Sequence, residues 1–186
     1  DMHALYGGVV PEIASRKHVQ AIAALSDKAL ADDFVTKATR LGYNTVRFHH
    51  FENGLLDPRA ADSLTFDPKA LDEFDYLFAE LKKHGIYLCL DLYASREMRP
   101  GDNVKEREGR TFERYGFEMK SLIPLSKSAM ANWKEFARRL LTHRNPYTGL
   151  TYAEDPALYS LNLVNENPLV SLWNRNPALV PLFEER

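Results

Sequence analysis

The dipeptide Asn165-Glu166 places a carboxylate where it is well situated for chemistry. It follows an apolar run, residues 158–164, which is bounded by Asp155-Pro156 and by Pro168. A run this short between prolines predicts a buried strand rather than a helix. In α/β barrels, a carboxylate at the point where a parallel strand ends lies on the catalytic face. Glu166 is therefore either a catalytic acid or a polar residue that caps a helix or pairs with a surface arginine such as Arg175.

The chemistry that a single buried-strand carboxylate suggests is proton transfer to a glycosidic oxygen. A glycosidase needs one carboxylic acid to protonate the leaving oxygen and a second carboxylate across the bond, about 5–5.5 Å away in a retaining enzyme. Glu166 is the candidate for the first role. The sequence nominates no residue for the second.

Arg47 is the second candidate, in the segment Thr-Val-Arg-Phe-His-His at residues 45–50. A guanidinium at the end of a buried strand is costly unless it is paired. It either holds a catalytic carboxylate ionised and in place or forms a structural ion pair with Asp91 on the neighbouring strand.

His49 and His50 point to opposite faces if this strand stays regular. One is then expected to face the site and the other to pack against a helix. Because no third ligand follows at a suitable spacing, we predict no metal site. The chain also carries none of the glycine-rich phosphate loops, nucleophile elbows or H-E-x-x-H motifs that would indicate a cofactor or another chemistry.

Two further side chains are candidates for contact with a sugar. Asp91, near the end of the apolar stretch 86–92 and beside Tyr93, either binds a sugar hydroxyl or supports Arg47. Trp173, downstream of Glu166, either stacks on a pyranose ring through its apolar face or belongs to the core.

Three helix-then-strand units position these residues. The first helix is expected to begin near Ser26, to bury Leu30, Phe34, Ala38 and Leu41, and to end at Gly42 before a strand at 45–48. The second is expected to be capped by Asp67, to start at Pro68 and to end at Gly85 before the strand 86–92. Its buried stripe should be Leu71, Phe74, Phe78 and Leu81. The third should bury Trp133, Phe136, Ala137, Leu140 and Leu141, break at 145–149 and precede the strand 158–164.

This alternation, with strands that are apolar on both faces, predicts an α/β fold with a parallel sheet. The segment 94–124 then lies on the carboxyl-end face as a lid or substrate-binding loop. A complete (β/α)8 barrel takes about 250 residues, whereas this chain has 186 residues and three evident strands. Residues 6–10, Tyr-Gly-Gly-Val-Val, could end an earlier strand or form its loop. We therefore expect residues 1–186 to form one partial barrel, about its first half.

Composition excludes some classes of protein. The formal net charge of −2 argues against a nucleic acid bound through a general basic surface. No apolar stretch reaches the roughly 18 residues that span a membrane. The sequence does not by itself indicate a cellular location.

Two segments resemble motifs of clan A glycoside hydrolases, in the right order. Residues 41–50, Leu-Gly-Tyr-Asn-Thr-Val-Arg-Phe-His-His, resemble the second-strand motif of the clan, and residues 161–168, Leu-Asn-Leu-Val-Asn-Glu-Asn-Pro, resemble its fourth-strand motif. The resemblance covers about residues 29–168, and it is greatest to cellulase- or mannanase-like enzymes of family 5.

The resemblance implies a TIM barrel and a retaining double-displacement mechanism on a polysaccharide or oligosaccharide. Glu166 would be the general acid/base, and the nucleophile, a glutamate on the seventh strand, would lie outside this chain in the missing half of the barrel. Asn165 would contact the 2-hydroxyl of the sugar, and Arg47 would support the nucleophile. His50 matches a histidine that some members carry. The third strand departs from the family, since Asp91-Leu-Tyr93 stands where many members have histidines. Family resemblance alone favours a secreted or periplasmic location.

The candidate site therefore contains one catalytic residue and six substrate-binding residues: Glu166, with Asn165, Arg47, His50, His49, Asp91 and Trp173. Two other hypotheses stay open. The protein is a non-catalytic carbohydrate-binding protein on a degenerate barrel, or a metal-dependent barrel hydrolase that uses His49, His50 and Asp91.

Overall fold

Three parallel strands form the centre of the protein. The computed structural model describes residues 28–105, 117–167 and 184. Within them β1 (Thr45–Phe48), β2 (Tyr87–Asp91) and β3 (Leu158–Asn162) form one sheet in the order β1-β2-β3. All pairings are parallel, with Phe48 beside Leu90 and Asp91 beside Asn162. The carboxyl ends of the three strands therefore lie together at one edge of the sheet.

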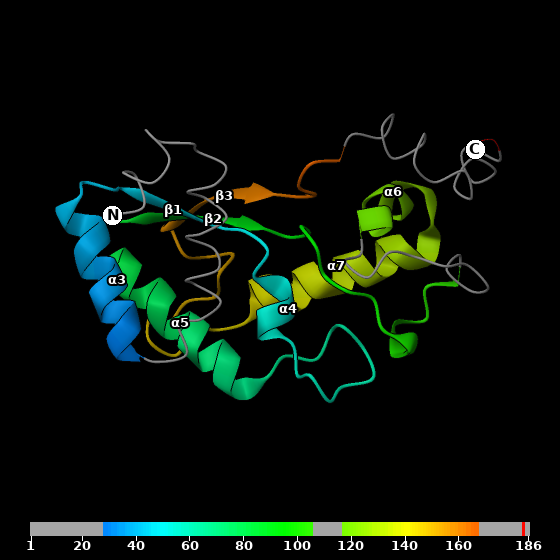
Figure 1. Cartoon of the computed structure of the whole chain (residues 1–186), viewed down its shortest axis with the longest axis horizontal. Helices are drawn as coiled ribbons and strands as arrows, with labels where there is room; N and C mark the ends of the chain where they lie inside the picture. The colour runs from blue at the N-terminus through cyan, green and yellow to red at the C-terminus, as the bar shows by residue number, and fades with distance from the viewer. Residues whose placement is uncertain (1–27, 106–116, 168–183, 185–186) are drawn as a thin grey trace, which may run out of the picture.

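Helices cover one face of this sheet. Figure 1 shows α3 (Lys28–Arg40), α5 (Pro68–Lys83) and α7 (Lys127–Thr142) on the same side of the strands. Shorter elements follow the strands: α4 (Glu52–Leu55), the 3-10 helix η1 (Pro100–Asp102) and α6 (Phe117–Leu125). The predicted α/β fold with a parallel sheet is confirmed for the described residues.

Local signals determine the bounds of α5. The Asp67 side chain accepts hydrogen bonds from the backbone N–H groups of Lys69 and Ala70, both at 2.9 Å, and Pro68 takes the first helical position. Gly85, just beyond the helix, has φ of 73°, a left-handed conformation that glycine adopts without strain. Cap, first residue and end were all predicted correctly, and the buried stripe includes Phe74, Phe78 and Leu81.

The buried face of α3 differs from the prediction. Leu30 and Leu41 were expected in the core, but they are 48% and 74% exposed. The helix buries Ala38, as predicted, and beside it the small side chains of Ala31 and Val35 where it packs against α5. Small residues allow two helices to approach closely, which outweighs the larger apolar residues of the neighbouring face. The expected start near Ser26 lies outside the described residues.

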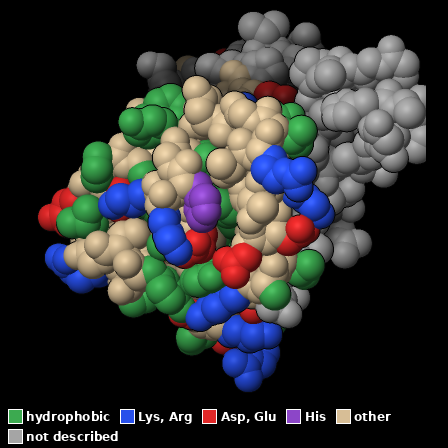
Figure 2. Space-filling view, turned by 90° about the vertical axis from the view of Figure 1, so that its left-hand side faces the viewer, with side chains coloured by type: hydrophobic (Ala, Val, Ile, Leu, Met, Phe, Trp, Pro, Cys, Tyr) green, Lys and Arg blue, Asp and Glu red, His purple; other side chains and the backbone are tan. Residues whose placement is uncertain are grey.

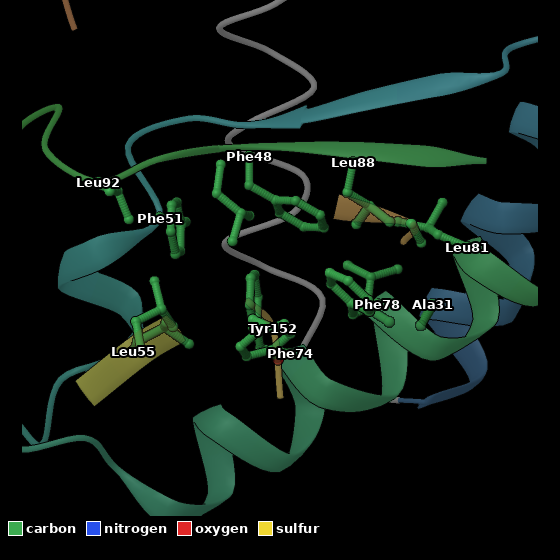
Figure 3. Packing of buried hydrophobic residues seen from close by; sticks show 14 of the residues in the cluster. Ala31, Phe48, Phe51, Leu55, Phe74, Phe78, Leu81, Leu88, Leu92 and Tyr152 are labelled. Carbon is green, nitrogen blue, oxygen red and sulfur yellow. The ribbon is translucent and has the colours of Figure 1, made fainter. Parts of the chain in front are cut away.

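An aromatic cluster joins the sheet to α5. Phe48 of β1 meets Phe74 edge-on at 4.9 Å between ring centroids, and Phe51 stacks on Phe74 at 5.3 Å. Tyr152 packs against the other side of the cluster, with its ring 5.7 Å from Phe74 and 4.8 Å from Phe78. Figure 3 shows these rings between the strands and the helix. Such edge and offset contacts are the favoured geometries of aromatic pairs.

Within the described residues no element covers the face of the sheet opposite the helices, which corrects the expectation of strands buried on both faces. Tyr87 and Tyr159 are 53% and 58% exposed, and their rings contact each other at 6.3 Å. Leu161 and Leu163 are also exposed. Among the described strands, β1 and β3 each have a neighbour on one side alone. This part of the protein therefore presents apolar surface and two strand edges.

The segment predicted as a long loop after the second strand is partly helical. It contains η1 and most of α6, and α6 packs against α7. Met119, Leu122 and Ile123 of α6 form a second apolar cluster with Tyr93, and Val164 packs against it. Because Tyr93 and Val164 follow β2 and β3, α6 lies beyond the carboxyl ends of these strands, as Figure 1 also shows.

Surface charges are mixed at the other end of the sheet. Figure 2 looks at the side opposite α6 and shows Lys and Arg side chains interspersed with Asp and Glu. No helix in the described parts of the chain combines the length and the hydropathy that crossing a bilayer requires.

The open face and edges generate a prediction about residues 1–186 expressed alone. Exposed strand edges and apolar patches favour association between copies. We expect this chain to sediment as oligomers or aggregates in analytical ultracentrifugation. Replacing both Tyr87 and Tyr159 by lysine should shift it toward the monomer, because the change removes exposed apolar surface and the lysines of one copy repel those of another. A wild-type chain that sediments as a cooperatively folding monomer would contradict the prediction.

Candidate active site

Arg47 and Asp91 form an ion pair where β1 and β2 end. Nε and Nη2 of Arg47 donate to the two carboxylate oxygens of Asp91 at 3.0 and 2.9 Å, a bidentate fork. The Asp91 side chain is fully buried, whereas the Arg47 side chain is 46% exposed. The sequence left open whether Arg47 pairs with Asp91, and the geometry answers that it does. Hydrogen bonding to Asp91 raises the pKa of Arg47.

His49 and Asn162 complete the surroundings of Asp91. The Nδ1 atom of His49 makes a short hydrogen bond to the same carboxylate, and the side chain of Asn162 makes another. Burial acts to raise the pKa of Asp91, but the hydrogen bonds from His49 and Arg47 outweigh it, so that the pKa is lowered from 3.8. The ionised carboxylate thus stabilises the fold above about pH 4, and this contribution is lost as the pH falls.

Arg47 also connects Asp91 to the segment that carries Glu166. Its Nη2 donates to Oδ1 of Asn165 at 2.6 Å. The Asn165 backbone N–H donates to the Tyr93 carbonyl at 2.8 Å, which ties the segment after β3 to the segment after β2. Asn165 is buried, and its Nδ2 has no hydrogen-bond partner among the described residues. A buried amide N–H2 without a partner is uncommon and suits an acceptor supplied by a ligand.

Glu166 is exposed and lies four residues beyond the end of β3, which stops at Asn162 rather than at the expected Val164. The charge of its carboxylate acts on Arg47, His50 and Lys120. Its φ of 45° lies in the left-handed region, as does the φ of 56° at His50. Such conformations are uncommon outside glycine and concentrate at functional sites.

His49 and His50 do not point to opposite faces, which corrects the prediction. β1 ends at Phe48, and the positive φ of His50 turns the chain, so the two rings lie 3.8 Å apart between centroids. Nδ1 of His50 is 2.7 Å from the Ser95 hydroxyl. Burial, followed by the positive charges available on His49 and Lys120, lowers the pKa of His50 to about 4. His50 is therefore a neutral hydrogen-bonding group at ordinary pH.

Two charged residues at this end of the sheet were missed by the sequence analysis. Glu52 of α4 is fully buried and accepts backbone N–H groups of Ala94 and Ser95, which fixes the turn that presents Ser95 to His50. Burial raises its pKa. Lys120 of α6 is 1% exposed; burial lowers its pKa, while the charges of Glu166, Glu52 and Asp91 act in the opposite direction. No local signal marks either residue, because each depends on the course of the chain after β1 or β2.

The structure thus brings together six of the seven predicted site residues: Glu166, Asn165, Arg47, His50, His49 and Asp91. Trp173 lies outside the described residues. In the part of the chain that the structure describes, no three His, Cys, Asp or Glu side chains are arranged to hold a metal ion. The arrangement offers an exposed carboxylate, a half-exposed guanidinium, a buried amide and a neutral imidazole, which is a set of groups suited to a polyhydroxylated ligand.

Most of the chain is similar to mannan-degrading enzymes. Mannan endo-1,4-beta-mannosidase 3 of Oryza sativa subsp. japonica is 26% identical over 132 residues, which cover 70% of this chain and 28% of that protein. Mannan endo-1,4-beta-mannosidase 5 of Arabidopsis thaliana is 24% identical over 146 residues, covering 74% and 32%. The solved endo-1,4-beta-mannanase of Rhizomucor miehei superposes with a TM-score of 0.54 at 19% identity and covers 78% of this chain and 42% of that one.

The first residues match a different family. The model for tRNA N6-adenosine threonylcarbamoyltransferase matches residues 1–39. The enzyme of that name from Syntrophotalea carbinolica is 70% identical over 30 residues, or 16% of this chain and 9% of that protein. Residues 6–10, predicted to end an earlier strand or to form its loop, lie outside the described residues.

The mannosidase similarities confirm the resemblance to family 5-like glycoside hydrolases that the two strand motifs predicted. The chain spans about a third of the length of these relatives, with 28% and 32% covered in the two plant proteins. The structural likeness shows the fold alone, and the described residues correspond to a part of it.

The lowered pKa of His50 gives a prediction for the full-length protein, by which we mean the product of the complete reading frame that contains this chain. Since His50 has a pKa of about 4 in the folded state and an ordinary histidine has a pKa of 6.5, the unfolded chain binds the proton first as the pH falls. Stability contributed at this site is thus lost progressively from about pH 6.5 to about pH 4. Histidine-labelled NMR should show a His50 ring that stays neutral at pH 5. Lys120→Met should raise the His50 pKa, because it removes a nearby positive charge. A His50 ring that titrates near 6.5 in the folded wild type would contradict the account.

Proposed function

We propose that this chain is part of a retaining β-glycoside hydrolase that acts on a polysaccharide or oligosaccharide, with Glu166 as its general acid/base. One observation carries the proposal. Arg47 donates to both Asp91 and Asn165, so a single guanidinium connects the carboxyl ends of three neighbouring parallel strands immediately beside an exposed glutamate. Chemistry in α/β barrels occurs at this end of the strands.

Each residue has a distinct role in this proposal. Glu166, exposed and in a left-handed conformation, protonates the leaving oxygen and then activates water. The buried Nδ2 of Asn165 donates to the sugar 2-hydroxyl, which would supply the partner that this amide lacks among the described residues. The exposed part of the Arg47 fork faces the nucleophile, a glutamate outside this chain. His49 and His50 form the wall of the sugar site, and Trp173 stacks on a sugar ring.

A β-1,4-linked mannan is the substrate to test first. The relatives that cover most of this chain are named as mannan endo-1,4-beta-mannosidases. The rest of the barrel is needed for a complete site in this proposal, since the described strands have open edges and the chain spans about a third of the relatives. The open face with Tyr87 and Tyr159 would become the interior of that barrel. In this proposal residues 1–186 form the partial barrel; residues 1–39, which include most of α3, also match the other family model.

The other two hypotheses have less support. A metal-dependent hydrolase would need His49, His50 and Asp91 around one ion, but Nδ1 of His49 and both oxygens of Asp91 are engaged in the hydrogen bonds described above. A non-catalytic carbohydrate-binding protein would retain sugar binding without turnover. The test below separates this last alternative from the proposal.

Glu166→Ala in the full-length protein is the decisive variant. Removing a general acid should lower kcat on β-mannan about 10²- to 10⁴-fold. It should spare the first step on dinitrophenyl glycosides of short manno-oligosaccharides, because that leaving group departs without a proton. Steady-state kinetics on both substrates, with mannan-binding calorimetry alongside, measures the contrast.

Glu154→Ala is the matched control, since Glu154 is an exposed glutamate that precedes β3 at the opposite end of the sheet. Its kinetics should equal those of the wild type. Wild-type protein that binds mannan without hydrolysing any β-glycoside would favour the binding protein, and an unimpaired Glu166→Ala variant would refute the role of Glu166.

A further inference from the structure

Asp91 is the most heavily engaged side chain at the carboxyl ends of the strands. Its carboxylate is fully buried on the centre strand. It accepts two hydrogen bonds from Arg47, forms one with Nδ1 of His49 and one with the side chain of Asn162. These donors come from β1, from the segment that follows β1 and from β3, the two strands that flank the strand of Asp91. A carboxylate so placed joins β1 and β3 to the centre of the sheet.

The position of Arg47 depends on this carboxylate. The Arg47 side chain is 46% exposed, so packing alone does not restrict its rotamers. The two-point fork with Asp91 supplies the restriction, because a bidentate pair sets the plane of the guanidinium as well as its distance. Nη2, held in this way, is 2.6 Å from Oδ1 of Asn165.

The position of Asn165 in turn restricts the position of Glu166, the next residue in the chain. Asn165 is buried, and its side-chain oxygen accepts from Arg47 while its backbone N–H donates to Tyr93. The next residue, Glu166, is exposed and has a left-handed backbone that neighbouring contacts must maintain. Hydrogen bonds therefore connect Asp91 to Arg47 and Arg47 to Asn165, and the peptide bond joins Asn165 to Glu166.

Direct contact between Asp91 and a sugar does not fit this geometry. Its side chain is 0% exposed, and both of its oxygens already accept hydrogen bonds. A sugar hydroxyl could reach it after displacement of Arg47 or His49. Of the two roles that the sequence left open for Asp91, support of Arg47 is therefore the one that the contacts favour.

We propose that Asp91 is a positioning residue that holds Glu166 in its working place through Arg47 and Asn165, and that it does not touch the substrate. This inference rests on the proposed glycosidase function. Asp91 also fixes the imidazole of His49, because the Nδ1 position is committed to the carboxylate and Nε2 is the ring atom left for other contacts.

Asp91→Asn in the full-length protein tests the proposal. Asparagine keeps the size of the side chain but removes the charge and turns one acceptor into a donor that faces Arg47. Since a displacement of about 1 Å at a catalytic group can cost about 10²-fold, we expect kcat on β-mannan to fall about that much with KM nearly unchanged. The loss should be much smaller in kcat/KM for the dinitrophenyl glycosides, because kcat/KM reports the first step and their leaving group departs without the acid.

Asp155→Asn is the matched control. Asp155 is also buried and pairs with a partly exposed cation, Lys82, at 2.8 Å, but it precedes β3 at the opposite end of the sheet. Both variants lose a buried ion pair, and thermal unfolding monitored by circular dichroism should show losses of stability for both. The kinetic effect should appear in Asp91→Asn alone. If Asp91→Asn does not fold, Asn162→Ala removes one donor to the same carboxylate and should give a weaker form of the same kinetic pattern.

Three outcomes would overturn the proposal. A folded Asp91→Asn variant with the kinetics of Asp155→Asn shows that the pair is structural. A raised KM with unchanged kcat shows that Asp91 contributes to substrate binding. Wild-type protein that is inactive on every glycoside would reject both the proposed function and this role of Asp91. An active wild type with an unimpaired Asp91→Asn variant would reject the role of Asp91 alone.

Discussion

The buried carboxylate of Asp91 is the constraint around which the described structure is organised. An ionised group that is out of contact with water is unfavourable unless nearby donors compensate it. The donors come from β1, from the turn after β1 and from β3, so neutralising one charge also aligns the carboxyl ends of three strands. The apolar cluster around Phe48 and Phe74 secures the other side of the sheet against α5. Packing and charge pairing thus act on the same strands from opposite faces.

The function that we propose depends on the polar groups near Asp91 that are still available to a ligand. Arg47 is held by Asp91 yet remains half exposed, and Asn165 is held by Arg47 yet keeps an amide N–H2 without a partner among the described residues. Glu166 follows them at the surface. A rigid interior with polar groups presented at its edge is the arrangement that precise proton transfer requires. The sheet face that carries Tyr87 and Tyr159 is exposed in the described structure. This exposure agrees with the fact that the chain spans about a third of the length of its mannosidase relatives.

Local patterns predicted the parts of this structure that local physics decides. Asp67, Pro68 and Gly85 each stabilise an end of α5 by themselves, and all three were predicted correctly. The predicted face of α3 was correct at Ala38 and wrong at Leu30 and Leu41, because close approach to α5 selects the smaller Ala31 and Val35. The orientation of His50 was wrong because β1 ends at Phe48, two residues before His50, and the chain then turns through a positive φ.

Long-range features were beyond the reach of sequence patterns. Glu52 and Lys120 come close to the site through a turn and a helix that lie in segments without clear periodicity. The pair formed by Arg47 and Asp91 was foreseen as one of two alternatives, because neighbouring parallel strands bring their ends together. The similarity of residues 1–39 to a second family was missed, since no change of composition or hydrophobic period marks where it stops.

The most direct test of the central claim is a crystal structure of full-length Glu166→Gln bound to a short β-1,4-linked manno-oligosaccharide. We expect the sugar chain to lie across the carboxyl ends of β1, β2 and β3. Its scissile oxygen should lie within hydrogen-bond distance of residue 166, about 3 Å, with the Asn165 amide on a ring hydroxyl and the Asp91 fork to Arg47 unchanged. An oligosaccharide bound elsewhere, or one that reaches Asp91 while residue 166 stays remote from the glycosidic oxygen, would contradict it.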